Sequence, residues 1–195
     1  IKNIGDLSVF MRFLKLCAGR IGQIINFQSL SNDVGVSDKT IKSWISVLET
    51  SYIIYFHQPH YKNFNKQISK SPKLFFYDTG LACSLLQIQN KEQLYSHYLI
   101  GGLFENFVLN EFHKSFQNRG LKPSFYFWQS KEKKEIDILL DNGDKILAFE
   151  VKLSQTKHQR FFDNLRYWQK LSDTPNDLLR VIYGGNENFK TSFGD

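Results

Sequence analysis

The sequence has few cysteines, and it has no long apolar run. Its two cysteines, Cys17 and Cys83, lie far apart in apolar surroundings among 195 residues. Two cysteines cannot form a metal site alone, and we expect two thiols in a reducing cytoplasm rather than a disulfide. No run approaches the ~18 apolar residues of a membrane span, and no signal peptide is visible. The sequence therefore predicts a cytoplasmic protein with no membrane partner.

The sequence also lacks the glycine-rich loops that bind nucleotides. Neither GxxxxGK[ST] nor GxGxxG occurs, and there is no internal repeat. Hydrophobic residues make up 42% and aromatic residues 15%, which is too much for a disordered chain. The net charge of +6 favours a polyanionic partner, because neutralising phosphates releases counterions. The chain begins with Ile1 rather than Met, so we interpret it as part of a longer protein.

A helix-turn-helix pattern follows a first predicted helix over residues 7–17. Apolar spacing predicts a helix over 27–34, and Gly35 can take the positive φ of a tight turn. Ser37 then offers an N-cap oxygen to a second helix, which would enter a major groove. The polar face of that helix carries the first candidate DNA-binding residues: Lys39, Lys42 and Ser43.

Two strand candidates after this helix indicate a wing. Residues 52–56 and 73–77 are rich in aromatic residues, and the connection between them is basic. A hairpin in this place is typical of a winged helix, and its tip would contact phosphates through Lys62, Lys66 and Lys70. A solvated loop is the alternative interpretation, and winged helices also bind proteins.

The second half of the chain changes to an α/β pattern. We place the domain boundary near residues 86–98, which gives a winged helix-turn-helix domain over 1–90 and an α/β domain over 91–195. The stretch 90–96 reads as a linker. The expected elements are helices over 78–86, 101–112 and 159–171, and strands over 125–129, 135–140, 145–152 and 178–183. A mixed α/β sandwich accommodates this order.

Three charged residues in this half have the layout of a catalytic site. Glu150 and Lys152 lie two apart on a strand, so their side chains leave the same face. The turn at Asn142-Gly143 folds the strand of Asp137 against them. Two converging carboxylates repel unless a cation neutralises them, and such oxygen ligands suit Mg²⁺ or Mn²⁺. Lys152 would orient the attacking water and offset the charge of the transition state.

A plain salt bridge on a solvent-facing sheet is the alternative for these three residues. Nearby, Lys157, His158 and Arg160 follow the strand of Lys152. They either hold a DNA backbone beside the site or form a solvated helix start.

The pattern of Asp137 followed by Glu150-Val151-Lys152 resembles the PD-(D/E)XK nuclease superfamily. That superfamily has an Asp on one strand, (Asp/Glu)-x-Lys on the next, and often a Glu from the preceding helix. Glu105 occupies the helical place. The resemblance implies a restriction-endonuclease-like domain in which Glu105, Asp137 and Glu150 bind Mg²⁺ or Mn²⁺ and Lys152 completes the catalytic set. A carboxylate favoured by the helix dipole is the alternative role for Glu105.

Further segments along nearly the whole chain resemble the DUF4143 family, the C-terminal part of prokaryotic AAA-type ATPases. They are Gly22–Asn26, Leu48–Ile53, Ser71–Ala82, Gly102–Val108, Tyr126–Trp128, Lys134–Asp137 and Phe149–Lys152. The resemblance implies an ATPase domain upstream in the same polypeptide.

Three functions are compatible with the sequence. The first is Mg²⁺-dependent hydrolysis of DNA phosphodiesters, with DNA positioned by the winged helix. The second is a catalytically inactive nuclease fold that binds DNA or a protein and regulates the upstream ATPase. The third is a winged-helix transcription regulator. An oligomer is compatible with each of these.

Overall fold

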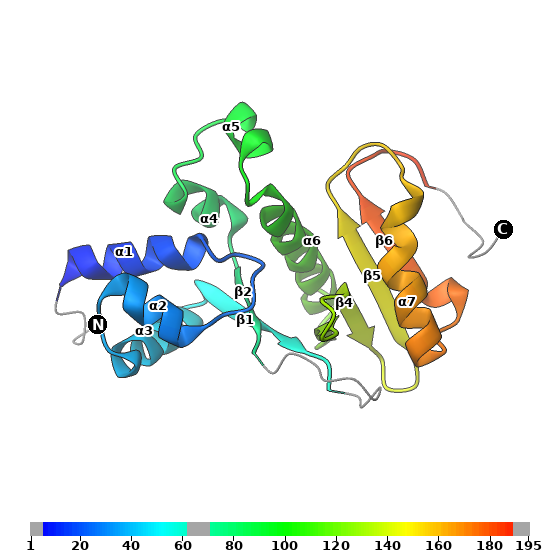
Figure 1. Ribbon diagram of the computed structural model, residues 1–195, viewed down its shortest axis with the longest axis horizontal. Coiled ribbons are helices and arrows are strands. Elements are labelled where there is room, and N and C mark those ends of the chain that lie inside the picture. Colours follow the sequence, from blue (N-terminus) through cyan, green and yellow to red (C-terminus); the bar gives the residue numbers. More distant parts are fainter. Residues whose placement is uncertain (1–5, 62–70, 189–195) are drawn as a thin grey trace. The chain divides into compact units, whose positions relative to one another are not determined.

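The computed structural model of the protein describes residues 6–61 and 71–188. In these residues seven α-helices and six β-strands form a mixed α+β fold (Figure 1). The strands form a mixed sheet with the order β2-β1-β3-β4-β5-β6. The chain divides into two compact units, each built from two segments: a first unit of Ile1–Phe56 and Ser71–Asn106, and a second unit of His57–Lys70 and Phe107–Asp195. The domain division expected after residue 90 stays a prediction.

Three helices open the first unit, α1 (Leu7–Ala18), α2 (Phe27–Val34) and α3 (Asp38–Thr50). Gly35 ends α2 in the left-handed conformation, with φ of 78°. The side chain of Ser37 then caps α3 by accepting a hydrogen bond from the backbone N–H three residues later. The helix pair and its glycine turn therefore form as the sequence predicts.

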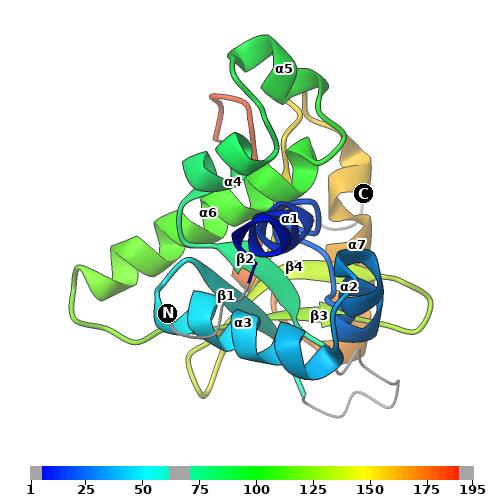
Figure 2. The same ribbon diagram turned by 90° about the vertical axis from the view of Figure 1, so that its left-hand side faces the viewer.

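An aromatic cluster joins α1 to α3. The rings of Phe10 and Phe13 lie 5.2 and 5.3 Å from the ring of Trp44, measured between centroids. Trp44 and Phe13 are buried, so the apolar faces of both helices meet in one core. Figure 2 looks onto this group of helices, with α1 seen end-on.

The two strands predicted as a wing are part of the sheet. They are β1 (Ile54–Pro59) and β2 (Lys73–Phe76). Every residue of β2 is buried, and the end of β1 pairs in parallel with β3. A winged form is therefore not confirmed. The basic tip residues predicted to contact DNA lie outside the described residues: Lys62, Lys66 and Lys70.

Three more helices follow, α4 (Thr79–Leu85), α5 (Lys91–Ser96) and α6 (Ile100–Gln117). The sequence interpretation of residues 90–96 as a linker is wrong. Asn90 accepts a hydrogen bond from the backbone N–H of Gln93 and caps α5, which has no buried residue. Because α5 has no apolar face in a core, hydrophobic periodicity could not reveal it. Helix α6 begins in the first unit and ends in the second.

Among the described residues, the second unit has four complete strands, one complete α-helix and the end of α6. Antiparallel pairing joins β3 to β4 and β4 to β5, and β6 pairs in parallel with β5. Asp141 accepts a hydrogen bond from the backbone N–H of Gly143 in the turn after β4, and Gly143 has φ of 88°. The bounds are β3 (Ser124–Gln129), β4 (Glu135–Asp141), β5 (Ile146–Lys152), α7 (Asp163–Ser172) and β6 (Leu179–Tyr183).

The second unit buries apolar side chains on both faces of these strands. Phe149 of β5 packs on Phe112, in the part of α6 that belongs to this unit, with ring centroids 5.1 Å apart. Helix α7 packs on the opposite face and forms a core with the strands. That core consists of Trp128, Ile136, Leu139, Ala148, Leu165, Trp168 and Leu179. Helices on both faces of a sheet agree with the predicted sandwich.

The two cysteines are free thiols, as the sequence predicts, but only Cys17 is buried and Cys83 is half-buried. Burial raises the pKa of Cys17 to about 12, so this thiol stays protonated. Within residues 6–61 and 71–188, none of the helices combines the length and apolar character that crossing a bilayer requires.

A close backbone approach in the first unit gives a stability test. A Cβ added to Gly102 would lie 2.6 Å from the carbonyl oxygen of Ile21. We expect Gly102→Ala to lower the free energy of unfolding by about 1–3 kcal/mol, because backbone must move to admit the methyl group. Urea unfolding of the purified variant measures the change.

The neighbouring Gly101 provides the matched control. A Cβ there meets no atom within 4 Å. Gly101→Ala should leave stability unchanged or raise it by up to ~1 kcal/mol, because alanine has the higher helix propensity. Equal effects of the two substitutions would contradict the close approach.

Candidate active site

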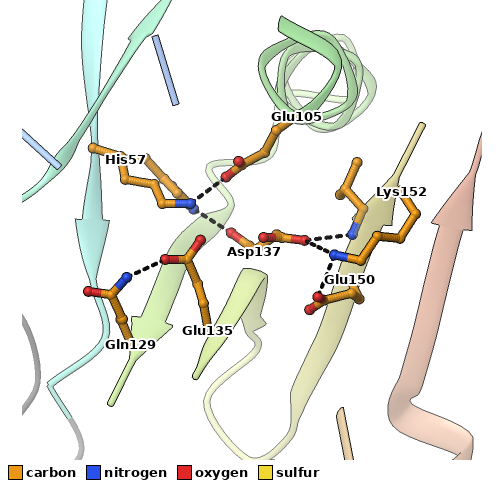
Figure 3. A network of polar contacts seen from close by, with 9 residues as sticks. His57, Glu105, Gln129, Glu135, Asp137, Glu150 and Lys152 are labelled. Carbon is orange, nitrogen blue, oxygen red and sulfur yellow. Dashed lines mark hydrogen bonds and ion pairs between the residues drawn. The ribbon is translucent and has the colours of Figure 1, made fainter. Parts of the chain in front are cut away.

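The pairing of β4 with β5 places the predicted carboxylates opposite each other. Ile138 is the partner of Phe149 in this antiparallel ladder. The neighbouring pair in the ladder is Asp137 and Glu150, which therefore face each other. Lys152 lies two residues after Glu150, on the same side of β5. Figure 3 shows the three side chains together. The sequence prediction that these residues converge is confirmed by their contacts.

Asp137 is held by a backbone group of β5 and by a side chain of β1. Its Oδ2 accepts a hydrogen bond of 2.7 Å from the backbone N–H of Val151, and the residue is 8% exposed. Its carbonyl oxygen lies 3.2 Å from Nε2 of the buried His57. These contacts fix the carboxylate beside β5, so its position does not depend on a flexible side chain.

Glu150 is the most buried member of the cluster, with 1% of its surface exposed. Its Oε1 accepts hydrogen bonds from Nζ of Lys152 at 2.6 Å and from Nδ2 of Asn164 at 3.0 Å. Its Oε2 is buried and has no hydrogen-bond partner in the described part of the chain. An oxygen in this state costs free energy unless a donor or a cation reaches it.

The surroundings of Glu150 oppose its negative charge. Burial, followed by the nearby charge of Asp137, raises the pKa of Glu150 to about 8. Lys152 and Asn164 act in the other direction and are outweighed. The Nζ of Lys152 lies 3.9 Å from Oδ2 of Asp137, so this lysine interacts with both carboxylates. A second positive charge would favour the ionised form of Glu150.

The donor set fits a divalent cation such as Mg²⁺ or Mn²⁺. Asp137 and Glu150 offer carboxylate oxygens, and Oε2 of Glu150 has no other partner in the described part of the chain. The sequence interpretation missed Glu135, a further carboxylate of β4. A carboxylate oxygen of Glu135 lies within 4.8 Å of a carboxylate oxygen of Asp137. The Oε2 of Glu135 accepts a hydrogen bond from Nε2 of Gln129.

Glu105, the helical carboxylate that the resemblance predicts as a metal ligand, belongs to the first unit. Glu105 lies on α6, where its Oε1 accepts a hydrogen bond of 2.8 Å from Nζ of the buried Lys73. The ion pair stabilises two charges in a place where neither could be buried alone. The role of Glu105 as a catalytic residue and metal ligand stays a prediction.

A pocket of about 450 Å³ opens beside Glu150 in the second unit. Its lining combines basic residues with the polar residues at the start of α7. The lining residues are Lys134, Glu150, Lys152, Leu153, Ser154, Arg160, Phe161, Asp163 and Asn164. A volume of this size can hold a group as large as a nucleotide. Of the three predicted site residues, Glu150 and Lys152 therefore border the pocket.

The remaining candidate DNA-binding residues lie on α3. Lys39, Lys42 and Ser43 are exposed, while Ile41 and Trp44 between and beside them are buried. The helix thus presents a polar face that includes two lysines, as predicted. Whether it binds DNA stays a prediction.

Asn164 and His57 contact the site, and the sequence interpretation did not select either. Asn164 comes fourteen positions after Glu150, and only the docking of α7 onto the sheet brings the two together. The one available signal is its place in the first turn of the helix that follows the Lys152 strand. His57 gave no signal, because its contact is with a backbone carbonyl.

Comparisons with known proteins identify two families of unknown function. Residues 100–195 match a domain of unknown function, DUF4143, and residues 1–92 match another, DUF8612. The predicted resemblance to DUF4143 is thus confirmed for residues 100–195. The earlier segments assigned to that family fall in the range of DUF8612 instead.

Two mycobacterial proteins are similar to most of the chain. An uncharacterised protein of Mycobacterium bovis and one of Mycobacterium tuberculosis are each 25% identical over 172 residues. The match covers 88% of this chain and 37% of each relative, so the chain spans little more than a third of their length. No solved structure matches the chain.

The raised pKa of Glu150 predicts a pH-dependent stability difference. The folded state retains the proton up to about pH 8, whereas the unfolded chain releases it near the ordinary value of 4.5. The wild type therefore loses stability as the pH rises between these values, by at most about 1.4 kcal/mol per pH unit. Glu150→Gln, which cannot ionise, should become increasingly more stable than the wild type from pH 5 to 8.

Urea unfolding in EDTA at several pH values measures this difference. Glu92→Gln is the control, because Glu92 is an exposed residue of α5. A constant difference between Glu150→Gln and the wild type across this range would contradict the raised pKa.

Proposed function

We propose that the second unit is a metal-dependent nuclease of the PD-(D/E)XK type that hydrolyses DNA phosphodiesters. Two observations carry the proposal: Asp137, Glu150 and Lys152 converge, and the buried Oε2 of Glu150 has no hydrogen-bond partner in the described part of the chain. The pocket beside them is open and lined by basic side chains. Phosphate chemistry needs this combination of a cation site and positive charge.

Each residue of the cluster has a defined task in this proposal. Asp137 and Glu150 would hold the divalent ion, which when bound supplies an activated water and neutralises phosphate charge. Asp137 is oriented by the N–H of Val151, and Glu150 by Asn164. Lys152, within reach of both carboxylates, would orient the attacking water and stabilise the negative charge of the transition state.

The first unit would bind the DNA duplex in the same proposal. Helix α3 exposes Lys39, Lys42 and Ser43, and it follows a turn of the helix-turn-helix kind. The net charge of +6 supports a polyanionic partner. Side chains on one exposed face could contact phosphates and base edges without disturbing the buried face.

A second candidate is a catalytically inactive module that regulates an ATPase domain elsewhere in the polypeptide. One observation favours it: Lys152 already interacts with both carboxylates, at 2.6 and 3.9 Å. A salt bridge of this kind needs no metal. The relatives are also much longer than this chain, which leaves room for a further domain.

Cleavage of DNA by the purified chain distinguishes the two candidates. We expect hydrolysis of a fluorescent duplex in Mg²⁺ or Mn²⁺ and none in EDTA. Lys152→Ala and Asp137→Asn should lower the rate at least ~100-fold, because each removes a group that stabilises the reacting charges. Gel electrophoresis of the products measures the rate.

The control for these variants is Lys145→Ala, which removes an exposed lysine next to β5 and should cleave at the wild-type rate. Circular dichroism confirms that each variant is folded. Wild-type protein that binds DNA without cleaving it in either metal, and shows no Mn²⁺ binding by calorimetry, would support the inactive module instead.

DNA binding by α3 is tested separately, in EDTA. The double variant Lys39→Ala, Lys42→Ala should lower the affinity for duplex DNA and reduce the slope of log affinity against log salt by about 2. Fluorescence anisotropy at several salt concentrations provides both values. The control, Lys15→Ala with Lys91→Ala, removes the same charge from exposed positions on α1 and α5. Identical slopes for the two double variants would exclude α3 as the contact.

A further inference from the structure

Arg160 differs from the other arginines of the chain in its contacts. The side chain of each of the other five makes a hydrogen bond or an ion pair within the described residues. Arg160 has neither in that part of the chain, although it lines the pocket beside Glu150. Its guanidinium therefore keeps all its donors available for a ligand.

The backbone of Arg160 is nevertheless fixed. It lies in the 3₁₀ turn Gln159–Phe162, and its carbonyl oxygen accepts a hydrogen bond from the N–H of Asp163. The next residue, Phe161, is 5% exposed and contacts the ring of His158, with centroids 5.4 Å apart. Because the neighbouring Phe161 is buried, the backbone of Arg160 is held in place beside the pocket while its guanidinium stays exposed.

The charges of the pocket favour an anion near Arg160. Lys134 is also exposed there and forms no ion pair in the described part of the chain. Lys152 interacts with the carboxylates, and the acidic Asp163 lies 3.7 Å from a guanidinium nitrogen of Arg166. Two basic side chains at the rim thus remain without a carboxylate partner among the described residues.

Lys157 is different, although it is close in sequence. Its ammonium pairs with the carboxylate of Glu187, and this contact raises the pKa of Lys157. Among Lys157, His158 and Arg160, which come directly after β5, Arg160 is therefore the residue that lines the pocket and keeps its donors available.

We propose that this pocket is the subsite for the phosphate next to the one that is cleaved, and that Arg160 binds it. This inference rests on the proposed function for its substrate, a DNA strand. The pocket shares Glu150 and Lys152 with the catalytic cluster, so a strand at the cluster continues into the pocket. The planar fork of a guanidinium matches two oxygens of one phosphate. Arg160 thus positions the strand and takes no part in the proton transfers.

Binding of DNA in EDTA tests the subsite without requiring cleavage. The probe is a fluorescent single-stranded oligonucleotide, measured by anisotropy with the full 195-residue chain. Arg160→Gln should weaken binding about tenfold, and Arg160→Lys should weaken it less, because lysine keeps the charge but loses the fork. The matched control is Arg180→Gln, which removes the same charge from an exposed position of β6.

An oligonucleotide with neutral methylphosphonate linkages identifies the contact. If Arg160 binds one phosphate, a single neutral linkage at the correct position should weaken wild-type binding and have no further effect on Arg160→Gln. Equal affinities of Arg160→Gln and Arg180→Gln would overturn the subsite.

The outcomes separate this inference from the proposed function. Wild-type cleavage combined with equal binding by the two arginine variants overturns the subsite and leaves the nuclease intact. An Arg160-dependent loss of binding in a protein that never cleaves supports the subsite as an anion-binding feature and overturns hydrolysis. Cleavage with a raised KM and an unchanged kcat in Arg160→Gln supports both.

Discussion

The register between β4 and β5 is the constraint on which the site depends. Side chains alternate between the two faces of a strand, so a slip of one residue would move every side chain of one strand to the opposite face. The observed pairing of Ile138 with Phe149 keeps the apolar residues in the two cores and places Asp137 opposite Glu150. The turn that contains Gly143 joins the two strands directly and maintains this pairing. The same interaction that buries the core therefore assembles the carboxylates.

Burying these carboxylates opposes the stability of the unit. A buried charge without full compensation costs several kcal/mol, and the raised pKa of Glu150 reflects this cost. Lys152 and Asn164 compensate one oxygen, and the other has no hydrogen-bond partner among the described residues. A core that only needed stability would place an apolar residue here. Retaining the acid is the kind of local conflict that accompanies a functional site.

Much of the fold follows from local sequence signals. The cap at Ser37, the turn at Gly35 and the alternation around Asp137 act within a few residues, so they can be recognised without a structure. Three features could not be recognised in this way. Helix α5 has no buried face, the predicted wing strands join the sheet by pairing β1 with a strand some seventy residues away, and Asn164 reaches Glu150 only because α7 docks on the sheet. Each depends on tertiary contacts that no local pattern encodes.

The second unit is built from two separate segments of the chain, which limits how the protein can be cut into fragments. The end of β1, at Gln58 and Pro59, is the parallel partner of β3 in this unit, yet it precedes the rest of the unit by almost fifty residues. A recombinant fragment that starts at residue 91 would lack this partner and leave the edge of β3 that pairs with β1 uncovered. An open strand edge readily pairs with another molecule, so such a fragment would tend to self-associate. We therefore expect the short strand after α3 to protect the second unit from aggregation by covering this edge.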